Sequence, residues 1–460
     1  MNNNAVTSNP LYYEKIYKLL FRYATPSIIS LLVGSLYNIV DQIFIGQGVG
    51  INGNAATNVA FPLSIICMSI SLFLGLGGAS SYSILLGQGN NKKAAKMIGN
   101  AIVLALILGF IFTVIVKLFN KNFMLMFGST NEVLGYAVEY TNITAFGFIP
   151  FIFSTVMSHI IRADGSPKYS MMSVLSGAII NTILDPILIF KFDMGMSGAA
   201  LATIIGQFVS FIMVVRYLFK FKNVTFERDS FAVEPKNVFK ILSLGASGGF
   251  NQFAMMAVQI TMNNVLSHYG TNSIYGGNIP LAVAGIISKI NMLVMAFIIG
   301  TSQGSQPIIG FNYGAKNYDR VIGAYKLTIT ITTIMAAIAF TLFQLLPRQI
   351  VAIFGDGSEL YFRFAEEYMR IYMALMVVNG IQPVTGTFFT SLGKAFKGAF
   401  IAMTRQIIFL LPLIIILPSI LGIDGVMYAG PIADGAALIV TIIMVSREIK
   451  NINRLKENNQ

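Results

Sequence analysis

The succession of apolar segments is the feature that most constrains what this chain can fold into. Apolar residues make up 55% of its 460 residues and charged residues only 11%, whereas soluble domains carry about 25% charged residues. Breaks rich in charge, glycine or proline separate twelve apolar segments, each long enough to cross a bilayer. The pattern predicts an all-α polytopic membrane protein with twelve transmembrane helices and no large soluble domain.

The lysines and arginines predict how the helices are oriented. With the N-terminus in the cytoplasm, 24 of the 31 basic residues fall in cytoplasmic segments, as the positive-inside rule requires. Both termini are then cytoplasmic, and the net charge of +12 needs no nucleic-acid partner. The expected organisation is a cytoplasmic tail, an N-lobe of six helices, a cytoplasmic linker, a C-lobe of six helices and a second cytoplasmic tail, at 1–20, 21–220, 221–237, 238–447 and 448–460.

An internal repeat relates the two halves of the chain. A shift of about 227 to 229 residues aligns Gly195-x-x-Gly198 with Gly422-x-x-Gly425. Each half holds an even number of helices, so both halves have the same orientation in the membrane. We therefore expect two six-helix lobes related by a pseudo-twofold axis along the membrane normal, with a substrate path between them.

Two acids inside the predicted spans mark a candidate ion site, because a carboxylate at the centre of a span costs about 2.5 to 3.5 kcal/mol on insertion scales. Asp41 and Asp185 lie toward the outer ends of the first and fifth helices, at a similar depth. Asn181 shares the helical face of Asp185, and Pro186 frees a carbonyl in the preceding turn. This oxygen-rich set suits a hard monovalent cation, and the same carboxyl pair can instead hold a proton.

Other residues of the spans are candidates for a substrate cavity or for bending. Asp434 lies beside Pro431, either within the last span or at a helix start, and Lys289 either lines a cavity or extends to the interface. Helices seven and ten carry amides but no acid, so we expect the charge chemistry to be concentrated in the first half. The candidate cavity residues are Asn38, Gln252, Met256, Lys289, Asn379 and Asp434, and the candidate bending point of the first helix is Pro26.

Several function classes are excluded by residues that the chain lacks. The single cysteine, Cys67, cannot form an internal disulfide, and two histidines cannot supply a multi-ligand metal site. A glycine pattern at 48–53 lies between membrane helices, and one at 245–249 has no partner for nucleophilic catalysis. We expect neither enzymatic activity nor a cofactor beyond a coupling ion.

Six segments in order across the chain resemble the multidrug and toxic compound extrusion (MATE) family and, within it, the MepA-like branch of bacterial multidrug efflux pumps. They are 37–46, 85–90, 161–168, 183–190, 198–203 and 430–434. The resemblance covers about residues 15 to 447. It implies a V-shaped pair of six-helix lobes that opens alternately to either side of the membrane and exports organic cations in exchange for Na⁺ or H⁺.

The resemblance also assigns an ion site in the N-lobe. Family members with such a site use positions that match Asp41, Asn181, Asp185, the backbone carbonyl of Ala199 and Thr203, and we expect Na⁺ at the four side chains of this set. Another branch of the family places acids on helices seven and ten, and this sequence lacks them.

The resulting expectation is a monomeric efflux antiporter of the bacterial cytoplasmic membrane that exports organic cationic or amphipathic drugs in exchange for Na⁺. Three alternatives stay open. They are H⁺ coupling by the same acids, a lipid-linked oligosaccharide flippase of the same superfamily, and a non-transporting receptor or membrane-embedded enzyme.

Overall fold

The computed structural model describes residues 6–354 and 357–458, and within them the chain folds into helices that form twelve spans. Ten of these are apolar and long enough to cross a membrane by length and composition, and a pair of helices bent by 53° forms another. The remaining span carries several amides. The spans are α3 (Ile16–Gly48), α4 (Ile51–Gly87), α5 (Asn91–Met126), α6 and α7 (Asn131–Thr144, Phe148–Ala163), α8 with η2 (Pro167–Pro186, Ile187–Lys191), α9 (Gly195–Tyr217), α10 (Pro235–Thr271), α11 (Asn278–Gly314), α12 (Tyr318–Leu345), α14 to α16 (Glu359–Tyr372, Met376–Asn379, Ile381–Ser391), α17, η5 and α18 (Ala395–Met403, Thr404–Leu410, Leu411–Leu421) and α19 (Asp424–Glu457).

The surface of the spans suits a lipid environment. On α5, for example, large apolar side chains are exposed along the helix. Such a face would be unfavourable in water but satisfies a bilayer, where the helix also pairs its own backbone groups. The exposed apolar side chains of α5 include Leu106, Ile107, Phe110, Ile111, Ile115 and Leu118. The prediction of an all-α multi-pass membrane protein is confirmed.

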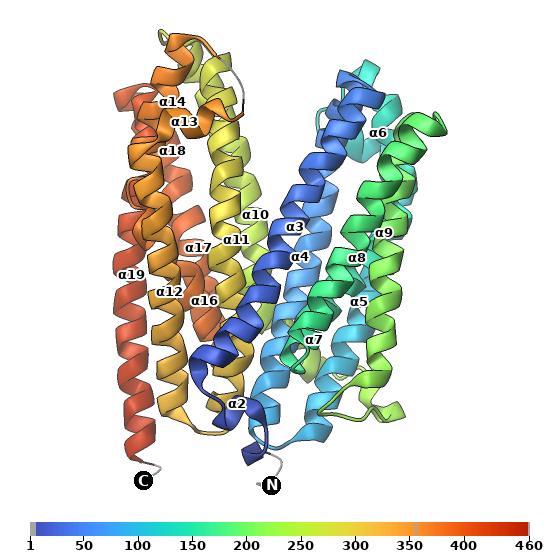
Figure 1. Ribbon diagram of the computed structural model, residues 1–460, viewed down its shortest axis with the longest axis vertical. Helices are drawn as coiled ribbons and strands as arrows, with labels where there is room; N and C mark the ends of the chain where they lie inside the picture. The colour runs from blue at the N-terminus through green and yellow to red at the C-terminus, as the bar shows by residue number, and fades with distance from the viewer. Residues whose placement is uncertain (1–5, 355–356, 459–460) are drawn as a thin grey trace.

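The two halves of the chain form two separate lobes. Figure 1 shows α3 to α9 on one side and α10 to α19 on the other, with both termini at the same end of the molecule. The helix ribbons of the two lobes approach each other toward the termini and diverge toward the opposite end. The arrangement is the V-shaped pair of lobes that the resemblance implies.

Backbone conformation repeats between the lobes at the offset found in the sequence. Gly195 and Gly422 both have positive φ, at 49° and 64°, and so do Gly165 and Gly393, at 86° and 75°. Positive φ is a conformation that glycine adopts readily and other residues rarely do. The turns that begin and end equivalent helices are therefore the same, which confirms the internal repeat.

The lobes meet where helix backbones touch directly. α4 packs on α10 and on α11, and α3 packs on α11. A Cβ atom on Gly87 would lie 1.9 Å from the carbonyl oxygen of Phe311, and one on Gly314 would lie 2.1 Å from that of Ile84. Because Gly87 and Gly314 are equivalent in the repeat, the pseudo-twofold axis passes between them. We call this contact the lobe seam.

Buried polar groups add hydrogen bonds across the lobe seam. Gln306 donates to the hydroxyl of Ser80 at 2.6 Å, and Arg162 donates to Oε1 of Gln303 at 2.8 Å. Ser69 donates to the carbonyl of Gly249 at 3.0 Å. Arg162 was expected among the basic residues of a cytoplasmic segment. It is buried between the lobes, where a polar partner on the opposite lobe satisfies its guanidinium.

The segment that precedes each lobe is bound by the other lobe. Ahead of α3, the short helix α2 (Pro10–Tyr13) is held by Arg320 of α12, which donates to the carbonyls of Leu11 and Glu14 at 3.1 and 2.5 Å. Ahead of α10, Glu234 of the linker accepts an ion pair from Lys96 of α5 at 3.0 Å. Both connections therefore close over the same end of the lobe seam.

Three helix ends differ from the expected segment boundaries. α3 begins at Ile16 within the expected first tail, α10 begins at Pro235 within the expected linker, and α19 continues to Glu457 through most of the expected last tail. The outermost parts of the two tails, 1–5 and 459–460, lie outside the described residues. Hydropathy alone ends a span where polar residues begin, whereas helices of membrane proteins extend beyond the apolar layer.

We expect Gly87→Ala to loosen the lobe seam, because its methyl group would meet the carbonyl oxygen of Phe311 at 1.9 Å. Overpacking of this kind costs about 1–3 kcal/mol. With the chain's single cysteine, Cys67, replaced by alanine, a cysteine in place of the fully buried Ser80 reports on the seam. A membrane-permeant maleimide should label it about fivefold faster, or more, in the Gly87→Ala protein.

Gly285→Ala is the matched control, because Gly285 also lies on a helix that reaches the seam, and a Cβ atom there meets nothing within 4 Å. Its labelling rate should equal that of the parent. Equal rates for Gly87→Ala and Gly285→Ala would contradict the proposed role of the glycine contact.

Candidate functional site

Helices α3, α8 and α9 bring the predicted ion-site side chains together inside the N-lobe. Asn181 and Asp185 lie one turn apart on α8, and Nδ2 of Asn181 donates to Oδ1 of Asp185 at 3.3 Å. The same Nδ2 donates to the hydroxyl of Thr203 on α9 at 3.5 Å. The carboxyl of Asp41, from α3, faces that of Asp185 within hydrogen-bonding reach. These four side chains are called the N-lobe cage below.

The N-lobe cage contains acceptors that no protein donor satisfies. Among the described residues, Oδ1 of Asp41, Oδ1 of Asn181 and Oδ2 of Asp185 are buried and lack a hydrogen-bond partner. Asp185 is fully buried and Asn181 is 3% exposed. Buried polar atoms are almost always paired, so three orphaned oxygens in one place indicate that a cation, a proton or a water completes the site.

Local packing explains why the cage forms at this point. Gly177 on α8 and Gly206 on α9 face each other so closely that a Cβ atom on either would lie 2.6 Å from the other's carbonyl oxygen. This approach brings Thr203 beside Asn181. At the end of α8, Pro186 cannot donate to the carbonyl of Thr182, and the π-helical turn η2 follows. Asp185 is thus placed where the helix is already irregular.

Two tyrosines near the cage were not predicted as site residues. Tyr37 on α3 and Tyr140 on α6 are half-buried near the two carboxyls, and the hydroxyl of Tyr140 lies within hydrogen-bonding reach of Thr203. Tyr37 precedes Asp41 by four residues and so shares its helical face. That spacing was a usable signal, whereas nothing in the sequence connects Tyr140 to the acids.

The other predicted residues lie on the same helices or in the C-lobe. Asn38 is exposed and donates to the carbonyl of Gly34 on its own helix at 2.6 Å. Ala199 is fully buried one turn before Thr203 on α9. Pro26 lies inside a helix that continues through it. In the C-lobe, the helices place Gln252 and Met256 half-buried on α10 and Lys289 exposed on α11.

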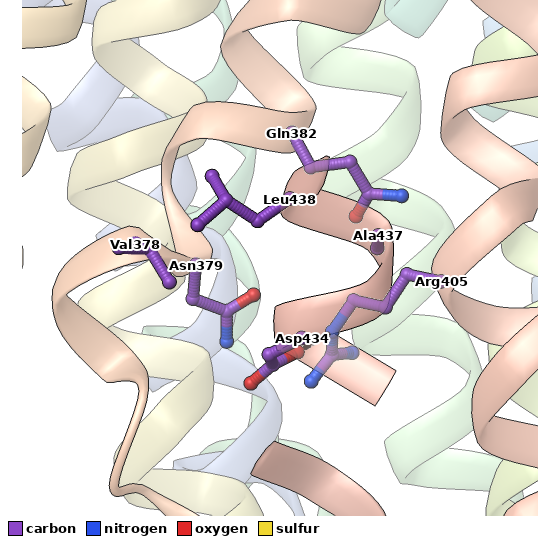
Figure 2. Close-up of a pocket in the computed structure, with 7 residues that line it drawn as sticks. All are labelled: Val378, Asn379, Gln382, Arg405, Asp434, Ala437 and Leu438. Atoms are coloured by element: carbon purple, nitrogen blue, oxygen red, sulfur yellow. Dashed lines mark hydrogen bonds and ion pairs between the residues drawn. The ribbon is translucent and has the colours of Figure 1, made fainter. Parts of the chain in front are cut away.

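A second polar cluster lies inside the C-lobe. Asp434 is buried within α19, well past its first turn, and its Oδ1 accepts a hydrogen bond from Nε of Arg405 in η5. Asn379 of α15 lines the same small cavity, of about 10 Å³ (Figure 2). Arg405 was expected in a cytoplasmic segment, and the charge chemistry was expected mainly in the first half. Arg405 instead lies inside the span Ala395–Leu421, where Asp434 gives its guanidinium a buried partner within the lobe.

The side chains of the N-lobe cage are suited to a monovalent cation or a proton. In the described part of the chain, no group of three or more His, Cys, Asp or Glu side chains comes together as a transition-metal site would require. Two carboxylates, an amide oxygen and a hydroxyl are hard oxygen ligands. The cage therefore fits an alkali ion better than a thiophilic or imidazole-binding metal.

The comparisons with known proteins identify the family. A model of the MatE family matches residues 26–187 and 249–416, once in each lobe. A protein of Staphylococcus haemolyticus named Multidrug export protein MepA is 27% identical over 442 residues, covering 94% of both chains. One of the same name from Staphylococcus aureus is 25% identical over 441 residues, covering 94% of this chain and 95% of its own.

Solved structures share the fold. A MOP superfamily transporter from Pyrococcus furiosus superposes with a TM-score of 0.89 at 23% identity, covering 98% of both chains. A multidrug resistance MATE family transporter in an outward-facing conformation gives the same TM-score at 22% identity and the same coverage. The chain belongs to the MATE family, and it is a membrane transporter rather than an enzyme.

We expect Asp185→Asn to stabilise the protein when no alkali ion is present, because the new amide can donate to the orphaned oxygen of Asp41 and removes one of two facing carboxylates. Satisfying a buried acceptor contributes about 1–3 kcal/mol. The midpoint of thermal unfolding, Tm, measured in choline chloride buffer, should rise. Asp193→Asn, at an exposed acid after η2, is the control and should leave Tm unchanged. A lower Tm for Asp185→Asn would contradict the absence of a donor at this site.

Proposed function

We propose that this transporter is a secondary active antiporter that exports organic cationic or amphipathic drugs in exchange for Na⁺. The observation that carries the proposal is the set of three orphaned oxygens in the N-lobe cage. A Na⁺ ion there would satisfy all three and balance the two facing carboxylates of Asp41 and Asp185. The multidrug export activity in the names of the staphylococcal relatives supports the class of substrate.

Coupling by H⁺ is the alternative that the same geometry supports. A single proton shared between the carboxyls of Asp41 and Asp185 would also relieve their repulsion. It would leave the amide oxygen of Asn181 without a partner, whereas a metal ion can bind this oxygen together with both carboxylates. This difference in ligand number favours Na⁺.

The proposed orientation places both termini in the cytoplasm, as the basic residues of the sequence indicate. The end at which the lobes diverge in Figure 1 then faces outward, and the lobe seam closes the cytoplasmic side. An ion that enters from outside reaches the cage in this conformation. Exchange requires the seam to open and the outer ends of the lobes to approach.

Energetics are compatible with one ion per transport cycle. A single charge that moves through a membrane potential of 100 mV supplies about 2.3 kcal/mol. The cage is formed entirely by helices of one N-lobe, so we propose that a monomer in the bacterial cytoplasmic membrane is the working unit.

We expect a Na⁺ gradient alone to drive ethidium transport by the purified protein in proteoliposomes, and Asp185→Asn to abolish this coupled transport. The variant loses a charged ligand of the ion but keeps the fold. The measurement compares an imposed Na⁺ gradient with an imposed pH gradient, for wild type, Asp185→Asn and the exposed control Asp193→Asn.

Each outcome of the transport experiment separates the alternatives. Transport driven only by the pH gradient would indicate that the cage binds a proton rather than Na⁺. Full activity of Asp185→Asn would remove this residue from the mechanism. If neither gradient moved ethidium in the wild type, the antiport proposal would fail, and the lipid-linked oligosaccharide flippase would be tested next.

Na⁺ should also raise the Tm of the wild-type protein, because an ion that binds only the folded state stabilises it. The stabilisation reaches about 2.7 kcal/mol when the ion concentration is about 100 times Kd. Titration of NaCl against choline chloride at constant ionic strength measures it. Asp41→Asn should remove the dependence on Na⁺, and an equal effect of Na⁺ and choline on the wild type would contradict the ion site.

A further inference from the structure

Three lysines gather where α5 of the N-lobe meets α10 of the C-lobe. The backbone N–H of Glu234, directly before α10, donates to Oδ1 of Asn100 at 2.9 Å, and Nδ2 of Asn100 donates to the carbonyl of Ala232 at 2.8 Å. These hydrogen bonds place the first turns of α10 beside the first turns of α5. The lysines at this junction, called the junction lysines below, are Lys93 on α5 and Lys236 and Lys240 on α10.

The positive charges of the junction lysines repel one another. Lys240 is half-buried, and the charges of the other two lie close enough to oppose its own. Two acids of the linker, Asp229 and Glu234, pair with Lys96 at 2.7 and 3.0 Å. Within the part of the chain that the structure describes, no ion pair includes a junction lysine. An anion from outside the chain would therefore relieve a repulsion that the fold maintains.

Exposed apolar side chains accompany the junction lysines. Phe239 of α10 is 75% exposed, and Phe231 and Val233 of the linker are 38% and 45% exposed. Phe239 follows Lys236 by three residues and directly precedes Lys240, so it lies on the same turns of the helix. A soluble anion would leave these apolar side chains uncovered, whereas the acyl chains of a lipid would cover them. Lysines and exposed apolar groups together therefore favour a lipid over a soluble anion.

From this arrangement we propose that the junction lysines bind the phosphate of an anionic phospholipid, with an acyl chain against Phe239. Basic groups between transmembrane helices are suited to such headgroups, and lysine stems extend along apolar surface to bring the ammonium groups to the interface. Figure 1 places the start of α5 at the end of the molecule that carries both termini. In the proposed orientation, the lipid therefore belongs to the cytoplasmic leaflet.

The lipid site adjoins the lobe seam and joins both lobes. Ile241, the residue after Lys240, packs on α4 so closely that a Cβ atom on Gly77 would lie 1.9 Å from its carbonyl oxygen. Lys93 belongs to the N-lobe and the other two junction lysines to the C-lobe, so one headgroup contacts both. The site is separate from the N-lobe cage and goes beyond the proposed antiport, since it needs neither a coupling ion nor a drug.

The test uses the absence of tryptophan from the sequence. Phe239→Trp places a single indole at the site of the full-length protein. The protein is reconstituted in phosphatidylcholine with increasing fractions of phosphatidylglycerol whose brominated acyl chains quench indole fluorescence on contact. The quenching curve should show a preference for phosphatidylglycerol of about fivefold or more. Phe110→Trp, at an exposed position in the middle of α5, is the reference reporter and should show no preference.

Charge variants in the Phe239→Trp protein assign the preference to the junction lysines. Replacing all three by glutamine should reduce the preference to less than about twofold. Replacing all three by arginine keeps the charges and should retain it. The matched control removes three positive charges at exposed lysines of α3, α12 and α19 and should also retain the full preference. Its substitutions are Lys18→Gln, Lys326→Gln and Lys450→Gln.

Two results would overturn the lipid site, namely equal quenching by the two lipids at the Phe239→Trp reporter, and a preference that survives replacement of the junction lysines by glutamine. Inorganic phosphate added at constant ionic strength should leave the preference unchanged. Its loss in phosphate would assign the lysines to a soluble anion instead. Both leaflets carry the same lipids in this assay, so neither the orientation of the protein nor a failure of coupled transport affects the result.

Discussion

The close approach of helix backbones at the lobe seam is the contact on which the rest of the structure depends. α4 and α11 cross at Gly87 and Gly314, and because these residues are equivalent in the repeat, one small contact lies on the axis that relates the lobes. In a membrane, helix association depends on packing and buried hydrogen bonds rather than on the hydrophobic effect, and small residues permit both. The helices of the two lobes therefore pack closely where glycines occur and do not touch where the lobes diverge. A transporter needs a contact of this kind, which holds one end closed but involves few enough residues to be exchanged for another.

The two lobes share a backbone plan but differ in their buried charges. The N-lobe cage presents two facing carboxylates and an amide, and three of their oxygens lack a hydrogen-bond donor. The C-lobe instead pairs Asp434 with Arg405, which leaves it close to neutral. Duplication of a six-helix unit explains the matching turns at Gly195 and Gly422. Divergence of a few side chains on that unit is sufficient to leave facing carboxylates in one lobe and a paired acid and guanidinium in the other.

Much of the N-lobe cage was predictable because charge in a membrane is costly and therefore rare. Asp41 and Asp185 were identified for that reason, and helical spacing connected Asn181 to Asp185. Arg405 was not predicted as part of a buried pair, because a basic residue between apolar segments is ordinarily assigned to a cytoplasmic loop. Its partner Asp434 also lies 29 residues away in sequence. Tyr140 was not predicted, because only the packing of α6 brings it close to the acids. The rotamer of Asn38, whose amide donates to the carbonyl of Gly34 on its own helix, is a detail that no sequence pattern encodes.

The path between the N-lobe cage and the lobe seam runs along a single helix. α3 carries Asp41 near one end, and near the other it packs on α11, where Ile28 and Ala24 contact Gly300 and Gly304. Pro26 lies between Ala24 and Ile28 in the sequence of α3. Because it cannot donate to the carbonyl of Arg22, α3 can bend there at a lower cost than elsewhere. Under the proposed antiport, a cation at Asp41 and Asp185 would draw α3 toward α8, and a change in the direction of α3 would act at the seam. Under the proposed antiport, a local ion-binding event thus reaches the closed end of the transporter through one helix, without a chain of intermediate side chains.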